Sequence, residues 1–262
     1  MFLTVDVGNT NTVFGCYDGS RLLFTARTTS ESRKTEDDYA MVIESILRMH
    51  GTDISQIDDG IISSVVPVLK RVLSDAFYLL KKKRMLIVSP DLDLGLKICT
   101  DNPYALGSDL IVDAVGAMAK YPLPLMIFDL GTATTLSVVD KDACYRGGMI
   151  MPGLRISADA LGSRTAQLPY INIETPPRLI GTNTVTCMQS GIVYGHAAMI
   201  DGLIERTEEE LGEPASVIVT GGLAPIITPL CRKKLTLDKD LLLDGLRVLY
   251  EKNKDRPRGT SR

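Results

Sequence analysis

The order of apolar and polar positions predicts alternating strands and helices. Three strand-like runs come first, over residues 3–7, 12–17 and 22–28, with a hairpin turn at Asp18-Gly19. Strand and helix then alternate, as a helix over 37–50, a strand over 61–66, a helix over 68–80 and a strand over 85–89. A further helix is predicted over 111–119, with Ser108 or Asp109 as its N-cap. This order predicts a mixed sheet with helices on its faces.

After Pro122 and Pro124 the same pattern begins again. Strands are predicted over 125–128, 136–140, 145–150 and 217–219, and helices over 156–167, 182–211 and 241–250. The expected fold is therefore α/β, with two related halves. We place the N-terminal half at residues 1–120, the C-terminal half at 121–252 and a polar tail at 253–262.

One local motif occurs in both halves. Val5 to Thr12 and Phe128 to Thr135 each contain an apolar run that ends in Asp, then one apolar residue, Gly, and small polar residues. Gly permits a tight turn and close approach to a ligand, and Thr and Asn offer hydrogen bonds to phosphate. An Asp-x-Gly turn alone is more often an ordinary hairpin. Two copies with matching flanks predict a nucleotide clamped between the halves.

A third motif, Val217 to Ala224, is a buried strand that leads into Gly221-Gly222 and a helix. The glycines let a flat ring approach the backbone. The three motifs in this order resemble the phosphate and adenosine motifs of the actin/hexokinase/Hsp70 superfamily.

The chain more closely resembles type III pantothenate kinase, over residues 1 to about 250. Matching stretches include Ser63-Ser64-Val65-Val66-Pro67, Asn102-Pro103, Leu106-Gly107-Ser108-Asp109, Pro152-Gly153-Leu154-Arg155 and Ile180-Gly181-Thr182-Asn183-Thr184. The resemblance implies two ribonuclease-H-like halves with a nucleotide cleft between them. It also implies ATP-dependent phosphorylation of the primary hydroxyl of pantothenate, the first step of coenzyme A biosynthesis.

The motifs supply candidate residues for ATP and its ions. The expected ATP-binding residues are Asp6, Val7, Gly8, Asn9, Thr10, Asn11, Thr12, Val13, Thr132, Gly221 and Gly222. Asp6 is expected to position magnesium through water, because magnesium releases its waters reluctantly. By resemblance, Asp129 binds a monovalent cation, potassium or ammonium.

Asp109 is the predicted catalytic base, because the resemblance places it where family members accept the proton of the substrate hydroxyl. From the residues alone, the role of a helix N-cap is favoured over catalysis. The expected substrate-binding residues are Thr100, Gly107, Ser108, Asp109, Leu110 and Thr184. A homodimer is expected, because the stretch 182–211 carries glycines and apolar residues on several faces. By resemblance, Thr184 of one protomer reaches the substrate of the other.

Two positions depart from the family pattern. The family has Arg where this chain has Leu110, and Tyr where it has Thr100. Pantothenate is a carboxylate, so the loss of a cation from its pocket weakens recognition. Three hypotheses follow: a pantothenate kinase with an altered acceptor pocket, a kinase of another small alcohol, or a non-catalytic relative of the Bvg accessory factor kind.

Composition narrows the function classes. The chain has 262 residues and a formal net charge of −3, without a basic stripe, so no nucleic-acid partner is expected. No apolar run reaches membrane-spanning length. The five cysteines are scattered and lack Cys-x-x-Cys spacing. This is typical of reduced thiols in a cytoplasmic protein, without a disulfide framework or zinc site.

Overall fold

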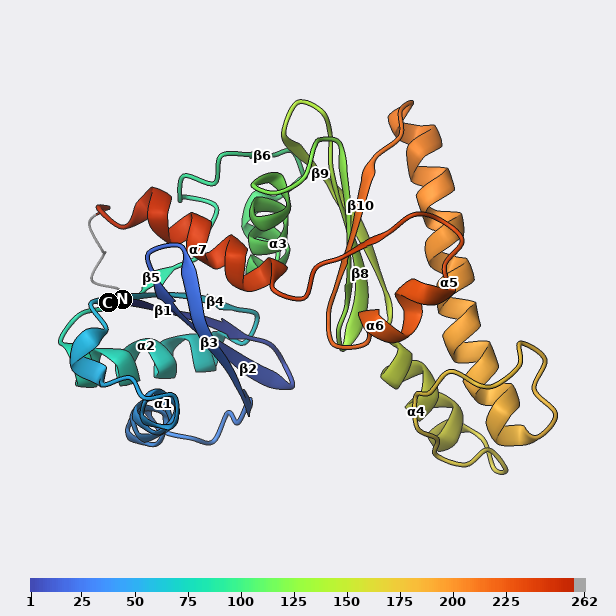
Figure 1. Ribbon diagram of the computed structural model, residues 1–262, viewed down its shortest axis with the longest axis horizontal. Helices are drawn as coiled ribbons and strands as arrows, with labels where there is room; N and C mark the ends of the chain where they lie inside the picture. The colour runs from blue at the N-terminus through green and yellow to red at the C-terminus, as the bar shows by residue number, and fades with distance from the viewer. Residues whose placement is uncertain (257–262) are drawn as a thin grey trace. The chain divides into compact units, whose positions relative to one another are not determined.

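A computed structural model of the chain describes residues 1–256, and contacts divide it into two compact units (Figure 1). Unit 1 comprises residues 1–96, 101–119 and 241–256, and unit 2 comprises residues 97–100 and 120–240. Each unit has one sheet with parallel and antiparallel neighbours. The predicted α/β class with a mixed, helix-flanked sheet in each half is confirmed.

The sheet of unit 1 has the order β3-β2-β1-β4-β5. Its strands are β1 (Phe2–Val7), β2 (Asn11–Asp18), β3 (Arg21–Thr29), β4 (Asp59–Ser64) and β5 (Leu86–Ile87). β1 is antiparallel to β2 and parallel to β4. The three N-terminal strands and the hairpin between β2 and β3 thus match their predicted places.

Helices cover both faces of this sheet. They are α1 (Glu36–Met49), α2 (Pro67–Lys81), α3 (Ser108–Met118) and α7 (Leu241–Asn253), with short 3₁₀ turns at Ile54–Gln56 and Pro103–Ala105. Successive strand residues point to opposite faces. Leu3, Val5 and Val7 accordingly join the core under α1 and α2, whereas Phe2 stacks on Tyr250 of α7 with ring centroids 4.1 Å apart.

Unit 2 repeats this topology. Its sheet has the order β11-β10-β7-β8-β9-β6, formed by Thr236–Leu237, Ser216–Thr220, Leu125–Leu130, Ala133–Val139, Cys144–Pro152 and Lys97–Ile98 respectively. β7 is antiparallel to β8 and parallel to β10, as β1 is to β2 and β4. The repeat expected from the two Asp turns is therefore present in the strand order.

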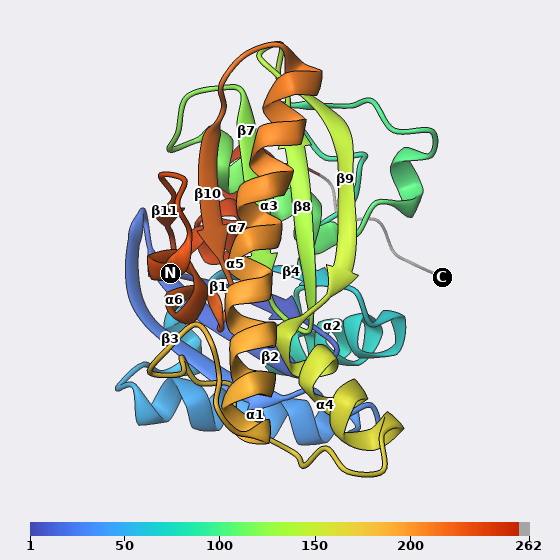
Figure 2. The same ribbon diagram turned by 90° about the vertical axis from the view of Figure 1, so that its right-hand side faces the viewer.

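The long helix α5 (Thr184–Leu211) lies along one face of this sheet (Figure 2). Met126 and Phe128 of β7 pack with Ile192 and Ile200 of α5 in the core of the unit. The other helices are α4 (Leu154–Arg164), which packs beside α5, and α6 (Ala224–Ile227), which a 3₁₀ turn at Thr228–Leu230 follows. No helix within residues 1–256 is both long and apolar enough to cross a membrane.

The C-terminal helix α7 packs with unit 1, although the sequence grouped its residues with the C-terminal half. Gly116 of α3 and Gly245 of α7 have no room for a Cβ, because the backbone of the other helix fills that space. Asn253 is buried as the last residue of α7, so the predicted polar tail does not begin there. Residues 257–262 lie outside the described part.

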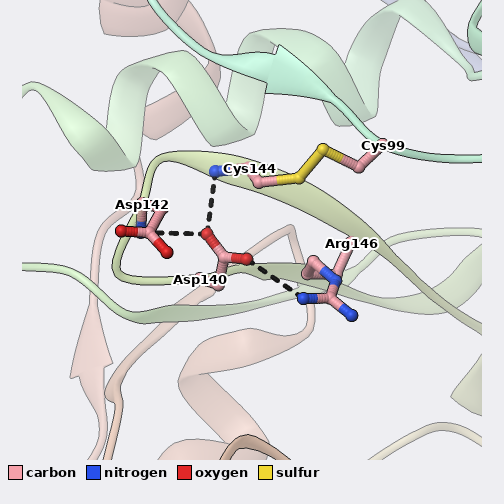
Figure 3. The surroundings of a disulfide bond; sticks show 5 residues. All are labelled: Cys99, Asp140, Asp142, Cys144 and Arg146. Carbon is pink, nitrogen blue, oxygen red and sulfur yellow. Dashed lines mark hydrogen bonds and ion pairs between the residues drawn. A yellow bond between two sulfur atoms is a disulfide. The ribbon is translucent and has the colours of Figure 1, made fainter.

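Cys99 and Cys144 form a disulfide, so the expectation that all five thiols are reduced is wrong for this pair (Figure 3). The two-residue strand β6 pairs with β9 and brings the cysteines together, with Cα atoms 6.0 Å apart. The Asp140 carboxylate holds the turn before β9, because it accepts the N–H groups of Asp142 and Cys144, each at 3.0 Å. Cys16, Cys187 and Cys231 are free.

Candidate active site

The first Asp turn joins β1 to β2 and presents polar groups at its tip. The Gly8 N–H donates to the Asn11 carbonyl oxygen over 3.0 Å and closes the turn. Asn9, Thr10 and Asn11 are exposed. Exposed amides and hydroxyls on a closed backbone turn are groups that phosphate oxygens can accept from.

The residue that follows strand β3, Ser30, is hydrogen-bonded to this turn. The Ser30 N–H donates to the Thr10 carbonyl oxygen over 3.0 Å, and the Ser30 and Thr12 hydroxyls lie 2.9 Å apart. Thr12 and Val7 are completely buried. These two expected ATP-binding residues therefore support the turn from within the core, and their side chains are not exposed to a ligand. Sequence reasoning did not single out Ser30, because nothing local links it to residues 10–12.

Asp6 lies at the end of β1, half-buried, on the face opposite the α1 and α2 core. In the sheet it stands beside Val13 of β2 and Ser63 of β4. Ile62 joins the core under α1 and α2, so Ser63 points to the same face as Asp6. The face that carries Asp6 is also the one that α3 and α7 cover.

Asp109 reaches this edge of the sheet through helix α3. The N-cap of α3 is Gly107, and neither Ser108 nor Asp109 caps the helix, contrary to the sequence expectation. Ser108 instead accepts hydrogen bonds from the Ser64 N–H and the Ser63 hydroxyl, each over 3.0 Å. Its side chain is thus engaged by β4. Asp109 is the next residue after Ser108, and Ser108 is bound to the end of β4 that pairs with Asp6.

The Asp109 carboxylate is half-buried, and Oδ1 accepts the Leu110 N–H over 2.9 Å. Burial raises the pKa of Asp109 above its ordinary value, and the backbone hydrogen bonds of Leu110 and Asp109 itself oppose this only in part. A carboxylate with a raised pKa accepts a proton more readily. The structure therefore gives Asp109 a property of a general base, and the alternative role as a helix cap is excluded.

The second Asp turn repeats the first in unit 2. Gly131 donates its N–H to the Ala133 carbonyl oxygen over 3.1 Å, and Thr132 is exposed. Asp129 occupies in β7 the place that Asp6 has in β1, beside Thr135 of β8 and Thr220 of β10. The arrangement of Asp6 and Asp129 across a cleft remains a prediction.

The glycine turn after β10 lies against Asp129. Gly221 has φ +94°, and a Cβ there would overlap the Asp129 carboxylate and the backbone of Leu130. A side chain is therefore excluded both by conformation and by space. Gly222 is exposed with nothing near its Cα that a Cβ would meet. The turn can thus bring bare backbone against a ligand at this point.

The remaining substrate candidates lie in separate elements. Thr100 follows β6, and its hydroxyl is buried without a hydrogen-bond partner within the described chain. Leu110 is the half-buried third residue of α3. Thr184 is the exposed first residue of α5, directly after the N-cap Asn183, whose side chain accepts the Thr186 N–H.

A family model described as type III pantothenate kinase matches residues 2–206 of this chain. The chain belongs to the type III pantothenate kinase family. A type III pantothenate kinase of Exiguobacterium sp. (strain ATCC BAA-1283 / AT1b) is 43% identical over 253 residues, which cover 97% of this chain and 99% of that protein. The predicted family and the prediction of a kinase are thereby confirmed.

Solved structures agree on the fold. A protein of Campylobacter jejuni described as a Baf family transcriptional activator has a TM-score of 0.62 at 17% identity, covering 97% of this chain and 100% of that one. An ROK hexokinase of Thermus thermophilus has a TM-score of 0.52 at 13% identity, with coverage of 97% and 99%. At these identities the likeness is one of fold alone. It places this pantothenate kinase family member on a kinase fold.

Proposed function

We propose that this protein transfers the terminal phosphoryl group of ATP to the primary hydroxyl of pantothenate, the first step of coenzyme A biosynthesis. The observation that carries the proposal is the attachment of Ser108 to the end of β4. This attachment sets the helix turn of Asp109 at the end of β4, where Ser63 stands beside Asp6 of β1. Identity of 43% to a type III pantothenate kinase over nearly the whole chain supports the same substrate.

Asp109 acts as the general base in this proposal. Its ionised carboxylate accepts the proton of the pantothenate hydroxyl as the oxygen attacks the terminal phosphorus of ATP. The backbone from Gly8 to Asn11 binds the phosphate oxygens. The Asp6 carboxylate would hold magnesium through water, because magnesium releases its waters reluctantly. Magnesium neutralises charge on the phosphates when it is bound.

The residues of the second unit have their own parts in the proposal. Thr132 contributes its exposed hydroxyl and backbone to the phosphates, and Gly221 and Gly222 pack on the adenosine. The Asp129 carboxylate is a hard oxygen donor, and by resemblance to the family it would hold a monovalent cation, potassium or ammonium. The absence of a side chain at Gly221 leaves the space beside Asp129 Oδ1 unfilled, which supports a cation site there.

The acceptor pocket is proposed to include Thr100, Gly107, Ser108, Leu110 and Thr184. Ser108 already accepts two hydrogen bonds, so toward a substrate it can only donate its own O–H. Leu110 offers no cation to the pantothenate carboxylate. Loss of a cation that pairs with a buried anion costs about 2–5 kcal/mol, so a high KM for pantothenate is expected.

We further propose a homodimer, with α5 in the interface. A Cβ added at Gly191, Gly195 or Gly202 of this helix would meet no atom of the described chain within 4 Å outside the helix's own backbone. A cavity of about 540 Å³ between α4 and α5 is lined by apolar side chains that include Leu161 and Met188. A second copy of the chain would cover these surfaces. Sedimentation at micromolar concentration tests this, and a fully active monomer would exclude the dimer.

A coupled assay of ADP release, with and without pantothenate, tests the proposed function. Pantothenate-dependent release of ADP supports it, and mass spectrometry should then detect 4′-phosphopantothenate. Release with another small alcohol in place of pantothenate would instead reassign the acceptor. ATP binding without release under any acceptor would favour a regulatory role, which the named relatives do not favour.

A further inference from the structure

A buried hydroxyl ends the otherwise apolar inner part of β4. Ser63 is completely buried and follows Ile61 and Ile62, which are also completely buried. A buried hydroxyl is costly unless it forms a hydrogen bond. Ser63 forms its bond with Ser108 of α3, with the two hydroxyl oxygens 3.0 Å apart. The strand therefore uses this position to hold the helix.

Ser108 is held by β4 at two points. Its hydroxyl oxygen accepts from the Ser63 hydroxyl and from the Ser64 N–H, both over 3.0 Å. The N-cap Gly107 has no side chain that could fasten the first turn of α3. The two bonds from β4 consequently attach the turn that contains Asp109 to the strand.

The other end of α3 is fastened independently. There Gly116 meets the backbone of Leu241 and Gly245 in α7, and residues 111–117 of α3 are buried. Removal of the serine pair should therefore loosen the first turn and leave the helix in place. A role in fold stability alone would not require the pair to lie next to the predicted base.

We infer that Ser63 is a positioning residue of this kinase, which orients Asp109 through its hydrogen bond to Ser108. The inference rests on the proposed function, because it assumes that Asp109 is the base. Ser63 also stands opposite Asp6 across the β1–β4 pair. The end of β4 thus lies beside Asp6, the residue proposed for magnesium, and it also holds the helix turn that carries Asp109. Both carboxylates are therefore positioned by the same strand end.

The test compares Ser63→Ala with Ser64→Ala. Ser64 is a matched control, because its hydroxyl bonds only locally with Val66 in the described structure, donating over 2.9 Å and accepting over 3.0 Å. Ser63→Ala should lower kcat by about 10- to 100-fold, since a displacement of about 1 Å at a reacting group costs up to about 10²-fold. The KM for ATP should stay within about twofold. Ser64→Ala should keep the wild-type kcat.

Two further readouts separate positioning from a general loss of structure. Amide hydrogen exchange over residues 107–110 should be faster in Ser63→Ala, with residues 111–118 unchanged. Ser108→Ala should reproduce the kcat loss without adding to that of Ser63→Ala in the double variant. Ser108→Ala alters a half-buried residue at the helix start, so the readout survives if Ser63→Ala unfolds.

The outcomes are distinguishable. A wild-type protein without pantothenate-dependent turnover overturns the proposed function before any variant is compared. An active wild type in which Ser63→Ala or Ser108→Ala equals Ser64→Ala in kcat and in exchange overturns the inference alone. Equal losses in all three variants would mean that the strand end as a whole is needed, and this too would overturn a specific role for Ser63.

Discussion

Substitution of Gly107 by alanine should disable the base without unfolding the protein. Gly107 has φ −58°, which any residue adopts, so the glycine is needed for space. An added Cβ would lie 2.5 Å from Oδ1 of Asp109. An ordinary contact is about 3.4 Å or more, so the carboxylate must move by about 1 Å. A displacement of that size at a reacting group lowers kcat by up to about 100-fold.

The effect of Gly107→Ala on stability should be small. Alanine at an N-cap costs about 1 kcal/mol relative to good capping residues, and the stiffer unfolded chain returns about 0.4–1 kcal/mol. The assay is kcat at saturating ATP and pantothenate, with thermal unfolding measured in parallel. In the Asp109→Asn background, Gly107→Ala should lower the residual rate no further. A wild-type kcat in Gly107→Ala would refute the reasoning. So would a further loss of the same size when Gly107→Ala is added to Asp109→Asn.

Other predictions concern the base, the acceptor pocket and the disulfide. Asp109→Asn should lower kcat by about 10²–10⁴-fold with ATP binding retained, and unchanged turnover would contradict the assigned role. Because burial raises the Asp109 pKa, kcat/KM of the wild type should rise with pH through a value above that of an ordinary aspartate. An acid limb at or below the ordinary value would speak against it. Leu110→Arg should lower the KM for pantothenate and leave the KM for ATP unchanged, since arginine supplies a donor fork for a carboxylate. Reduction of the Cys99–Cys144 disulfide, which spans 45 residues, should lower the free energy of unfolding by up to about 4 kcal/mol. Cys99→Ser, which cannot form the disulfide, should lose no further stability when the reductant is added.

The base also affects stability. A carboxyl whose folded pKa is raised takes up a proton on folding between the unfolded and folded pKa values. The contribution of Asp109 to stability is therefore fully present below its unfolded pKa, and it is lost as pH rises through the raised folded pKa. At neutral pH the folded protein must hold an ionised, partly desolvated carboxylate. Asp109→Asn should for this reason unfold at a higher temperature than the wild type at pH 7, and a lower temperature would contradict the assigned burial effect.

Much of the fold was predictable because each half repeats a short-range pattern. Each Asp turn joins two strands whose apolar residues follow the period of a sheet. The strands next in the chain, β4 and β10, pair in parallel with β1 and β7. The packing of α7 with unit 1 was not predictable in this way. It depends on the close contact of Gly116 with Gly245, residues distant in the chain.

The parts of the site that sequence reasoning missed depend on tertiary hydrogen bonds. Ser108 or Asp109 was predicted as the helix cap, because a serine or aspartate before an apolar helix usually is one. In the structure its oxygen accepts from β4 instead, and Gly107 takes the N-cap position. The cysteine pair was missed for a similar reason. Cys99 and Cys144 come together only because the two-residue strand β6 pairs with β9.

The Asp-x-Gly turn occurs in both units, but the strand beside its Asp carries different residues in each. In unit 1 the strand beside Asp6 carries Ser63, whose hydroxyl holds a helix and with it a second carboxylate. In unit 2 the strand beside Asp129 leads into Gly221, whose missing side chain brings backbone against the carboxylate. A hydroxyl that fixes the turn of Asp109 suits the proton transfer proposed for that residue, and bare backbone beside the Asp129 carboxylate suits the cation binding proposed there. In this proposal one repeated strand pair supports two kinds of chemistry, and the residue on the neighbouring parallel strand decides which.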